Sequence, residues 1–151
     1  MAADWTPADP DYATRVQQSF ERQIFMQTLG AELGVVKPGY VEITLPFQEA
    51  LTQQHGFLHA GAVTSVVDSA CGYAALTLMP AGAAVLSVEF KVNLLAPAKG
   101  EFMIAEGRVK KAGRTLMVCT GDVWAVEGDT RKNVTTMTAT MMVVEGRGLS
   151  D

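Results

Sequence analysis

Asp68 is the one charged residue in a long run of small and apolar residues, residues 60–79. About twenty residues at roughly 1.5 Å rise would span about 30 Å as a helix. Because this helix would be apolar or small nearly all round, we expect it to be buried. Burying an unpaired carboxylate costs free energy. Asp68 is therefore a functional group in a cleft, a structural group with a hydrogen-bonding or charged partner, or a residue on the one exposed edge of the helix.

Small and polar residues share the helix face of Asp68 if the segment is helical. Gly61, Thr64, Ser65 and Gly72 lie three, four or seven residues from it, which is the spacing of one face. A ligand could lie across such a face. Alternatively, small residues there let a sheet approach the helix closely.

The remaining reactive side chains do not form a metal site. The two histidines, His55 and His59, are not accompanied by clustered acids, and this makes a poor ligand set. Cys71 and Cys119 lack metal-ligand spacing and lie in apolar surroundings, so we interpret them as buried free thiols of a reducing cytoplasm.

Composition indicates one globular domain over residues 1–151, with irregular ends at 1–10 and 146–151. Hydrophobic residues make up 48% of the chain and charged residues 19%, enough to bury a core. The net charge of −4 argues against nucleic-acid binding, which leaves a basic footprint. The chain begins without a signal-peptide pattern, and residues 60–79 carry Asp68 and several hydroxyls. We therefore expect no membrane span and a cytoplasmic protein.

The elements around Asp68 predict an α+β fold. Apolar periodicity indicates a helix over residues 11–28 that ends at Gly30. Alternation and turn signals predict strands over residues 31–36, 40–45, 83–95, 101–111, 115–127 and 132–144. In residues 83–95, Val88, Phe90 and further apolar residues share one side, with Ser87 opposite. A curved antiparallel sheet around the long helix would bury both, and its open edges could be covered by another copy.

This order of elements, with His59-Ala60-Gly61 starting nine residues before Asp68, resembles the hotdog-fold acyl-CoA thioesterases. The phenylacetate-pathway (PaaI-type) subgroup is the most similar. The resemblance covers roughly residues 20–144. Gln53 and residues 87–97 also match the family and make the resemblance more specific. It implies a hotdog fold: five or six strands wrapped around one central helix, with an extra N-terminal helix.

The resemblance also implies a role for each matching residue. Asp68 corresponds to the catalytic acid, which acts as nucleophile on the thioester carbonyl or as general base for water. Gln53 corresponds to a residue that positions water or the thioester, and His59 to an orienting histidine. The backbone N–H of Ala60 corresponds to the oxyanion donor, which suits a helix start with its partial positive charge. Ser87 corresponds to a strand hydroxyl that helps to hold the water.

Two positions depart from the family pattern. Ala60 replaces the first glycine of the motif. The backbone N–H donor is kept, but the methyl group leaves less room for the thioester carbonyl to approach it. Gln54 stands beside Gln53 and could take the same role, but the spacing favours Gln53. Alternatively, His55 and His59 simply cap or hydrogen-bond in a loop.

Lys110, Lys111 and Arg114 cluster at an expected hairpin turn. They could be a solvated turn. With Arg131 and Lys132 they could instead bind the phosphates of coenzyme A (CoA), because Lys and Arg readily bind phosphate. CoA would then be part of the substrate, and no separate cofactor is expected.

The resemblance favours an acyl-CoA thioesterase built as a homodimer or a tetramer of two dimers, with Asp68 reaching the thioester from the facing subunit. The alternative is a non-catalytic acyl-CoA binder. Enoyl-CoA hydration ranks third, because Asp68 and His59 would lie about 13 Å apart along a helix. The sequence does not identify the preferred acyl group, although the small residues Gly72 and Ala75 suggest room for an aryl group or a medium chain.

Overall fold

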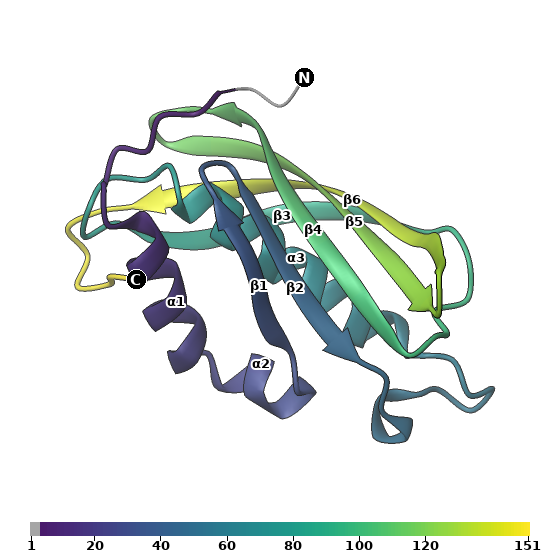
Figure 1. Cartoon of the computed structure of the whole chain (residues 1–151). Helices are drawn as coiled ribbons and strands as arrows, with labels where there is room; N and C mark the ends of the chain where they lie inside the picture. Colours follow the sequence, from purple (N-terminus) through teal and green to yellow (C-terminus); the bar gives the residue numbers. More distant parts are fainter. Residues whose placement is uncertain (1–3) are drawn as a thin grey trace.

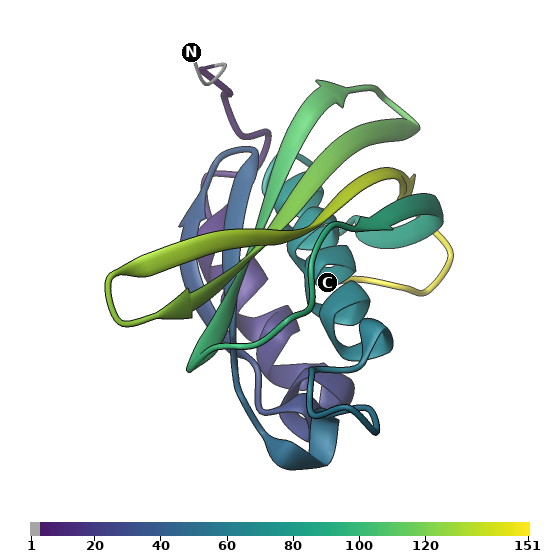
Figure 2. The same ribbon diagram turned by 90° about the vertical axis from the view of Figure 1, so that its right-hand side faces the viewer.

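Six antiparallel strands form one curved sheet in the order β1-β2-β4-β5-β6-β3. In this computed structural model, which describes residues 4–151, the sheet wraps around a single long helix, α3 (Figures 1 and 2). This is the predicted arrangement of strands around a central helix. The first three residues of the expected irregular segment 1–10 lie outside the described residues. The strands are β1 (Glu32–Lys37), β2 (Tyr40–Pro46), β3 (Ala84–Leu94), β4 (Phe102–Ala112), β5 (Leu116–Glu127) and β6 (Thr130–Val144).

Helix α3 (Ala60–Leu76) lies directly against the concave face of the sheet. Its sheet-facing residues, such as Val66 and Ala70, are fully buried. A Cβ at Gly107 of β4 would stand 2.2 Å from the carbonyl oxygen of Ala70, closer than real Cβ contacts. The glycine on the strand, rather than the small residues of the helix alone, therefore permits the close approach of helix and sheet.

The N-terminal helix is interrupted, so the prediction of one helix over residues 11–28 is wrong. Helix α1 (Tyr12–Arg22) and helix α2 (Ile24–Leu29) are separated by Gln23, which has an extended backbone (φ −78°, ψ 92°). Turn hydrogen bonds satisfy the interrupted backbone: Gln23 N–H donates to the Phe20 carbonyl, and Met26 N–H donates to the Gln23 carbonyl. The turn allows Met26 to be buried in the core. Gly30 ends α2, as predicted, and it does so in the left-handed conformation.

Helix α3 ends at Leu76 rather than at residue 79, the expected end. Its last carbonyls are taken by a side chain from α1, since Arg15 donates to the carbonyls of Leu76 and Met79 at 2.8 Å each and to that of Pro80 at 2.6 Å. Thr77 then donates its hydroxyl to the Ala74 carbonyl. The Arg15 contacts, which come from far along the chain, satisfy carbonyls at the point where the helix ends, and Pro80 follows shortly after.

Strand β3 lies at an edge of the sheet and contains a bulge between Ser87 and Glu89. The bulge inserts one residue, so the alternation of side chains changes phase there. Ser87 pairs with Met141 and Phe90 pairs with Ala139, and both partners are fully buried. The sequence-based placement of Ser87 opposite Phe90 is therefore wrong, because both face the helix side of the sheet. A short 3-10 turn, η1 (Glu49–Leu51), precedes α3.

Among residues 4–151, no helix is both long enough and apolar enough to cross a membrane.

Candidate active site

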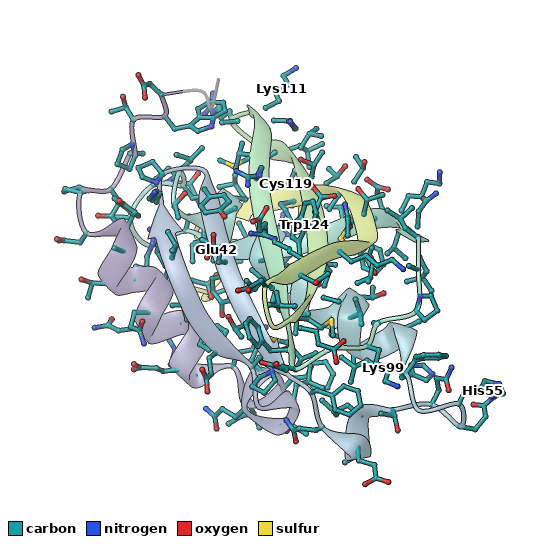
Figure 3. The ribbon with its side chains drawn as sticks, turned by 45° about the vertical axis from the view of Figure 1, so that its right-hand side comes forward. Glu42, His55, Lys99, Lys111, Cys119 and Trp124 are labelled. Carbon is teal, nitrogen blue, oxygen red and sulfur yellow. The ribbon has the colours of Figure 1, made fainter. Side chains whose placement is uncertain are left out.

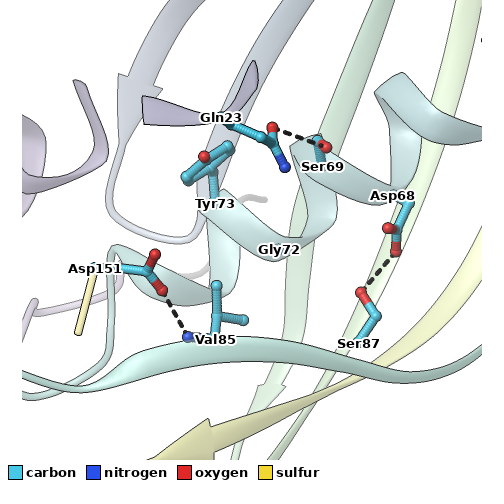
Figure 4. Close-up of a pocket in the computed structure, with 8 residues that line it drawn as sticks. All are labelled: Gln23, Asp68, Ser69, Gly72, Tyr73, Val85, Ser87 and Asp151. Atoms are coloured by element: carbon cyan, nitrogen blue, oxygen red, sulfur yellow. Dashed lines mark hydrogen bonds between the residues drawn. The ribbon is translucent and has the colours of Figure 1, made fainter. Parts of the chain in front are cut away.

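Asp68 and Ser87 form a hydrogen-bonded pair between α3 and the edge strand β3. The Ser87 hydroxyl donates to Asp68 Oδ1 at 2.8 Å, and the contact is drawn in Figure 4. The sulfur of Met141 lies 3.4 Å from the same hydroxyl oxygen. The bulge in β3 makes this pair possible, because it turns Ser87 towards the helix.

The environment of Asp68 keeps its carboxylate more basic than a free one. The side chain is half-buried, and burial raises its pKa, while the hydrogen bond from Ser87 lowers it in part. A carboxylate whose pKa lies nearer neutrality is a stronger general base at neutral pH. Perturbed acids cluster at functional sites, which agrees with the first of the three interpretations, while the partner Ser87 agrees with the second, a structural group with a partner. The catalytic role of Asp68 stays a prediction.

A cavity of about 120 Å³ adjoins this pair. Figure 4 shows it running from Asp68 and Ser87, past Gly72, towards Tyr73 and Asp151. Sequence reasoning missed five of its lining residues: Gln23, Ser69, Tyr73, Val85 and Asp151. Gln23 enters only because the N-terminal helix breaks there, and Asp151 enters because the chain after β6 folds back against β3. No local sequence signal indicates either event.

Within the part of the chain that the structure describes, the start of α3 has one backbone N–H without a hydrogen-bond partner. His59 is the N-cap, and its Nδ1 accepts a hydrogen bond from the Gly61 N–H at 2.8 Å. The Ala62 N–H donates to the His59 carbonyl at 3.0 Å. The first amides of a helix have no partner within the helix, so Ala60 N–H is the one left for a ligand. His59 thus orients the helix start, and its Nδ1 is an acceptor.

Gln53 lies beside this helix start. It shares a second cavity, of about 660 Å³, with Gln54, His59 and Ala60. The Gln53 Oε1 accepts a hydrogen bond from the backbone N–H of His55, which leaves its amide NH₂ free to donate. Gln54 is the more exposed of the two glutamines. The other residues that line this cavity are Phe57, Leu58, Val63, Leu94, Leu95, Ala96, Pro97, Ala98 and Thr135.

A single chain does not bring the two halves of the predicted site together. Asp68 and Ser87 line one cavity, whereas Gln53, His59 and Ala60 line another. Ala60 and Asp68 are separated by two turns of α3, about 12 Å. One substrate carbonyl cannot contact both within one protomer.

The basic cluster lies at the turn between β4 and β5. Lys110, Lys111 and Arg114 are exposed there, and Figure 3 shows Lys111 at the opposite end of the molecule from His55. Strand pairing links this turn to the beginning of β3, since Leu116 pairs with Met142, which pairs with Leu86. The cluster therefore lies towards the Ser87 end of β3, on the half of the predicted site that contains Asp68.

Arg131 does not join that cluster. It forms an ion pair with the buried Glu106 and stacks over the Trp124 ring, 4.7 Å from its centroid. Arg108 also pairs with Glu106, at 2.9 Å. Arg131 is thus held on the outer face of the sheet, while Lys132 is exposed.

Both cysteines are buried and unbridged, as predicted. Within residues 4–151, no cluster of three or more His, Cys, Asp or Glu residues has the geometry to hold a metal ion.

A curved antiparallel sheet wrapped around one long helix is the architecture of the hotdog fold. Residues 55–132 match the model of the Thioesterase superfamily, and the chain belongs to this family of thioester hydrolases. Human acyl-coenzyme A thioesterase 13 is 31% identical over 70% of this chain and 73% of its own.

Solved structures agree with this assignment. The crystal structure of a thioesterase family protein from Silicibacter pomeroyi superposes with a TM-score of 0.88 and 53% identity, and covers 89% of this chain and 99% of that one. The E. coli PaaI protein from the phenylacetic acid degradation operon has a TM-score of 0.81 over 92% of this chain and 97% of its own. Its identity is 18%, so it supports the fold alone.

Proposed function

We propose that the protein hydrolyses the thioester of an acyl-CoA, in an active site that two protomers build together. The observation that carries this proposal is the half-buried Asp68, held by Ser87 on the central helix of a thioesterase fold. Human acyl-coenzyme A thioesterase 13, a relative by sequence, supports acyl-CoA as the substrate class.

The exposed edge strand supports a homodimer, alone or as half of a tetramer. Among residues 4–151, strand β3 has no neighbouring strand on its outer side, and an open edge of this kind invites pairing with another strand. Its large apolar side chains are exposed: Val88 by 52%, Phe90 by 43% and Leu94 by 56%. Antiparallel pairing of two β3 strands would bury them. It would also place the Leu94 end of one strand, which lines the Ala60 cavity, beside the Ser87 end of the other.

In the proposed mechanism, Ala60 N–H of one protomer hydrogen-bonds the thioester oxygen and stabilises the negative charge that develops on it. A donor of this kind is worth about 3–4 kcal/mol. Asp68 of the other protomer either attacks the carbonyl carbon or takes a proton from an attacking water. In the general-base route, the water oxygen bonds to the carbonyl carbon, the C–S bond breaks, and the CoA thiolate takes the proton held by Asp68 as the free acid is released. In the nucleophilic route, the C–S bond breaks to leave an acyl-Asp68 anhydride. Water then hydrolyses the anhydride to the free acid and regenerates the Asp68 carboxylate, and the thiolate takes up the proton that this water loses.

The supporting residues act on either side of this centre. The Gln53 amide hydrogen-bonds the water or the thioester. Ser87 holds the Asp68 carboxylate, and His59 fixes the start of α3. Lys110, Lys111 and Arg114, all exposed on the Asp68 half, are our candidates for the CoA phosphates. The buried free thiols of Cys71 and Cys119 suit a reducing compartment such as the cytoplasm.

Asp68→Asn tests this function directly. The substitution keeps the shape of the side chain but removes the nucleophile or base, so we expect kcat to fall by about 10³-fold or more. Free-thiol release should be measured on short, medium, long and aryl acyl-CoA esters, with circular dichroism as the folding control. Equal turnover by both proteins would make Asp68 structural. Binding of acyl-CoA without turnover by the wild type would make the protein a non-catalytic binder.

A further inference from the structure

One end of the convex face of the sheet combines exposed apolar side chains with exposed cations. We propose that this end binds the surface of an anionic lipid bilayer without crossing it. The proposal goes beyond the thioesterase function and does not rest on it, because binding to lipid can be measured without turnover.

The apolar side chains form a row across three neighbouring strands. Leu116 of β5 pairs with Met142 of β6, and Met142 pairs with Leu86 of β3. Met117 and Met141, the next residues on β5 and β6, are buried on the helix side, so the alternation of side chains places the row on the convex face. Leu116 is 48% exposed and Leu86 46%. A contiguous apolar patch with polar residues around it is typical of an interaction surface.

Three cations border this row on the β4 side. Lys111 pairs with Val118, which is the residue after Leu116 on the same face of β5. Lys110 lies in the β4 bulge next to it, and Arg114 lies in the turn before β5. All three are exposed, and within residues 4–151 none of them forms an ion pair. Their charges are therefore available to an anionic surface.

The acids at this end lie on the other side of the row, at β3. Glu89 accepts a hydrogen bond from the Thr140 hydroxyl, and the Asp151 carboxylate accepts two hydrogen bonds from within the protein. Glu89 is three strands away from the β4 cations, about 14 Å, which exceeds the Debye length of about 8 Å at physiological ionic strength. In the exposed segment after β6, Glu145 and Arg147 offset one another. The cations therefore keep a local positive field in a chain of net charge −4.

This combination favours a lipid surface over a soluble anion. The phosphates of CoA need only the cations and leave the apolar row unexplained. Neither of the two cavities described above is lined by Leu116, Met142 or Leu86, so the row is a surface rather than a pocket. An anionic bilayer attracts nearby Lys and Arg side chains, and its boundary between headgroups and acyl chains takes up apolar ones.

Pairing of two β3 edges leaves this surface free. Strand pairing joins backbones in the plane of the sheet, whereas the side chains of the row point out of that plane. Leu86 and Ser87 are consecutive residues on opposite faces. A protein seated on lipid through Leu86 therefore holds the Ser87 end of its predicted site close to the bilayer.

Sedimentation of the purified full chain with lipid vesicles tests the proposal. The vesicles consist of phosphatidylcholine alone or of phosphatidylcholine mixed with the anionic phosphatidylglycerol. We expect the association constant to be about tenfold higher for the anionic vesicles. High salt should lower it by about the same factor, because salt screens exposed charges.

Two variants separate the apolar contribution from that of the charges. Leu116→Ser and Lys111→Glu should each lower the association constant for anionic vesicles at least about fivefold. Ile24→Ser, at a position on α2 that is 69% exposed, is the control for the first. Lys99→Glu, at the opposite end of the molecule (Figure 3), is the control for the second. Both controls should bind as the wild type does, and circular dichroism confirms that all four variants fold.

Three results would overturn the proposal. The first is no binding of the wild type to anionic vesicles at low salt. The second is equal binding by Leu116→Ser and the wild type, since charge alone would then hold the protein. The third is no binding to vesicles together with a lower sedimentation coefficient for Leu116→Ser, which would make the row a contact between copies of this chain. None of these results affects the thioesterase proposal, which Asp68→Asn tests separately.

Discussion

Ser87 and burial act on Asp68 in opposite directions. Burial raises the pKa of the carboxyl, and the Ser87 hydroxyl, which donates to the charged form, lowers it. The net effect raises the pKa of Asp68, so its carboxylate is more basic than a free one. If Asp68 is the base or nucleophile, its charged form is the active one, so activity falls as pH decreases through its pKa.

Ser87→Ala should therefore move the acid limb of the pH dependence of kcat/KM to higher pH. Without the hydroxyl, the effect of burial is unopposed, and a higher pH is needed to ionise Asp68. We also expect kcat near neutrality to fall about tenfold, which a pH–rate profile on one acyl-CoA measures. Ser87→Thr keeps a hydroxyl and is the control. An acid limb that stays in place, or moves to lower pH, would exclude this role for Ser87.

Arg15 joins the N-terminal helix to the end of the central one. It is 8% exposed, pairs with Asp9 at 3.3 Å, and donates to three carbonyls at and beyond the end of α3. A cation there also complements the negative end of the helix dipole. The contact fixes α1, and through it Gln23, against the helix that carries Asp68.

Arg15→Met should lower the free energy of unfolding by about 2–4 kcal/mol, because Asp9 and the carbonyls lose a buried charged partner. Urea denaturation followed by circular dichroism measures this. The matched control is Arg22→Met, since Arg22 is exposed on the same helix and its replacement should change stability by less than about 0.5 kcal/mol. Equal denaturation midpoints for the two variants would show that the Arg15 contacts make no net contribution to the free energy of unfolding.

The molecule as a whole carries the two halves of its proposed site at different places on one chain. Phe90→Lys would place a charge on the exposed β3 edge, so we expect a monomer that is folded but has lost activity by about 100-fold or more. Sedimentation velocity gives the mass, and thiol release gives the activity. Lys91→Glu, a charge change at an already polar exposed position, is the control. A fully active monomer would contradict the shared site.

A shared site also predicts complementation between two inactive variants. In a mixed dimer of Asp68→Asn and Gln53→Ala chains, one site carries both defects and the other carries neither. Random exchange of subunits should therefore restore roughly a quarter of the wild-type sites. The measurement is thiol release before and after the two proteins are unfolded and refolded together. Activity that stays at the level of the separate variants would place both residues in the same protomer's site.

The pattern of residues along the chain was sufficient for much of this structure. The strands, the central helix around Asp68 and the left-handed Gly30 follow from periodicity and turn chemistry, which act between residues close in sequence. The motif around Ala60 and Asp68 further indicated the family, and the comparisons confirm it. The catalytic roles of these residues stay predictions.

Other features depend on contacts between residues far apart in the sequence. The break at Gln23, the end of α3 under Arg15 and the bulge that turns Ser87 towards Asp68 arise where burial and hydrogen bonding outweigh local preference. The fold-back of the chain that places Asp151 in the cavity is of the same kind. Such contacts form only when the chain has folded, so they cannot be predicted from any short segment of the sequence. They determine which groups lie around Asp68.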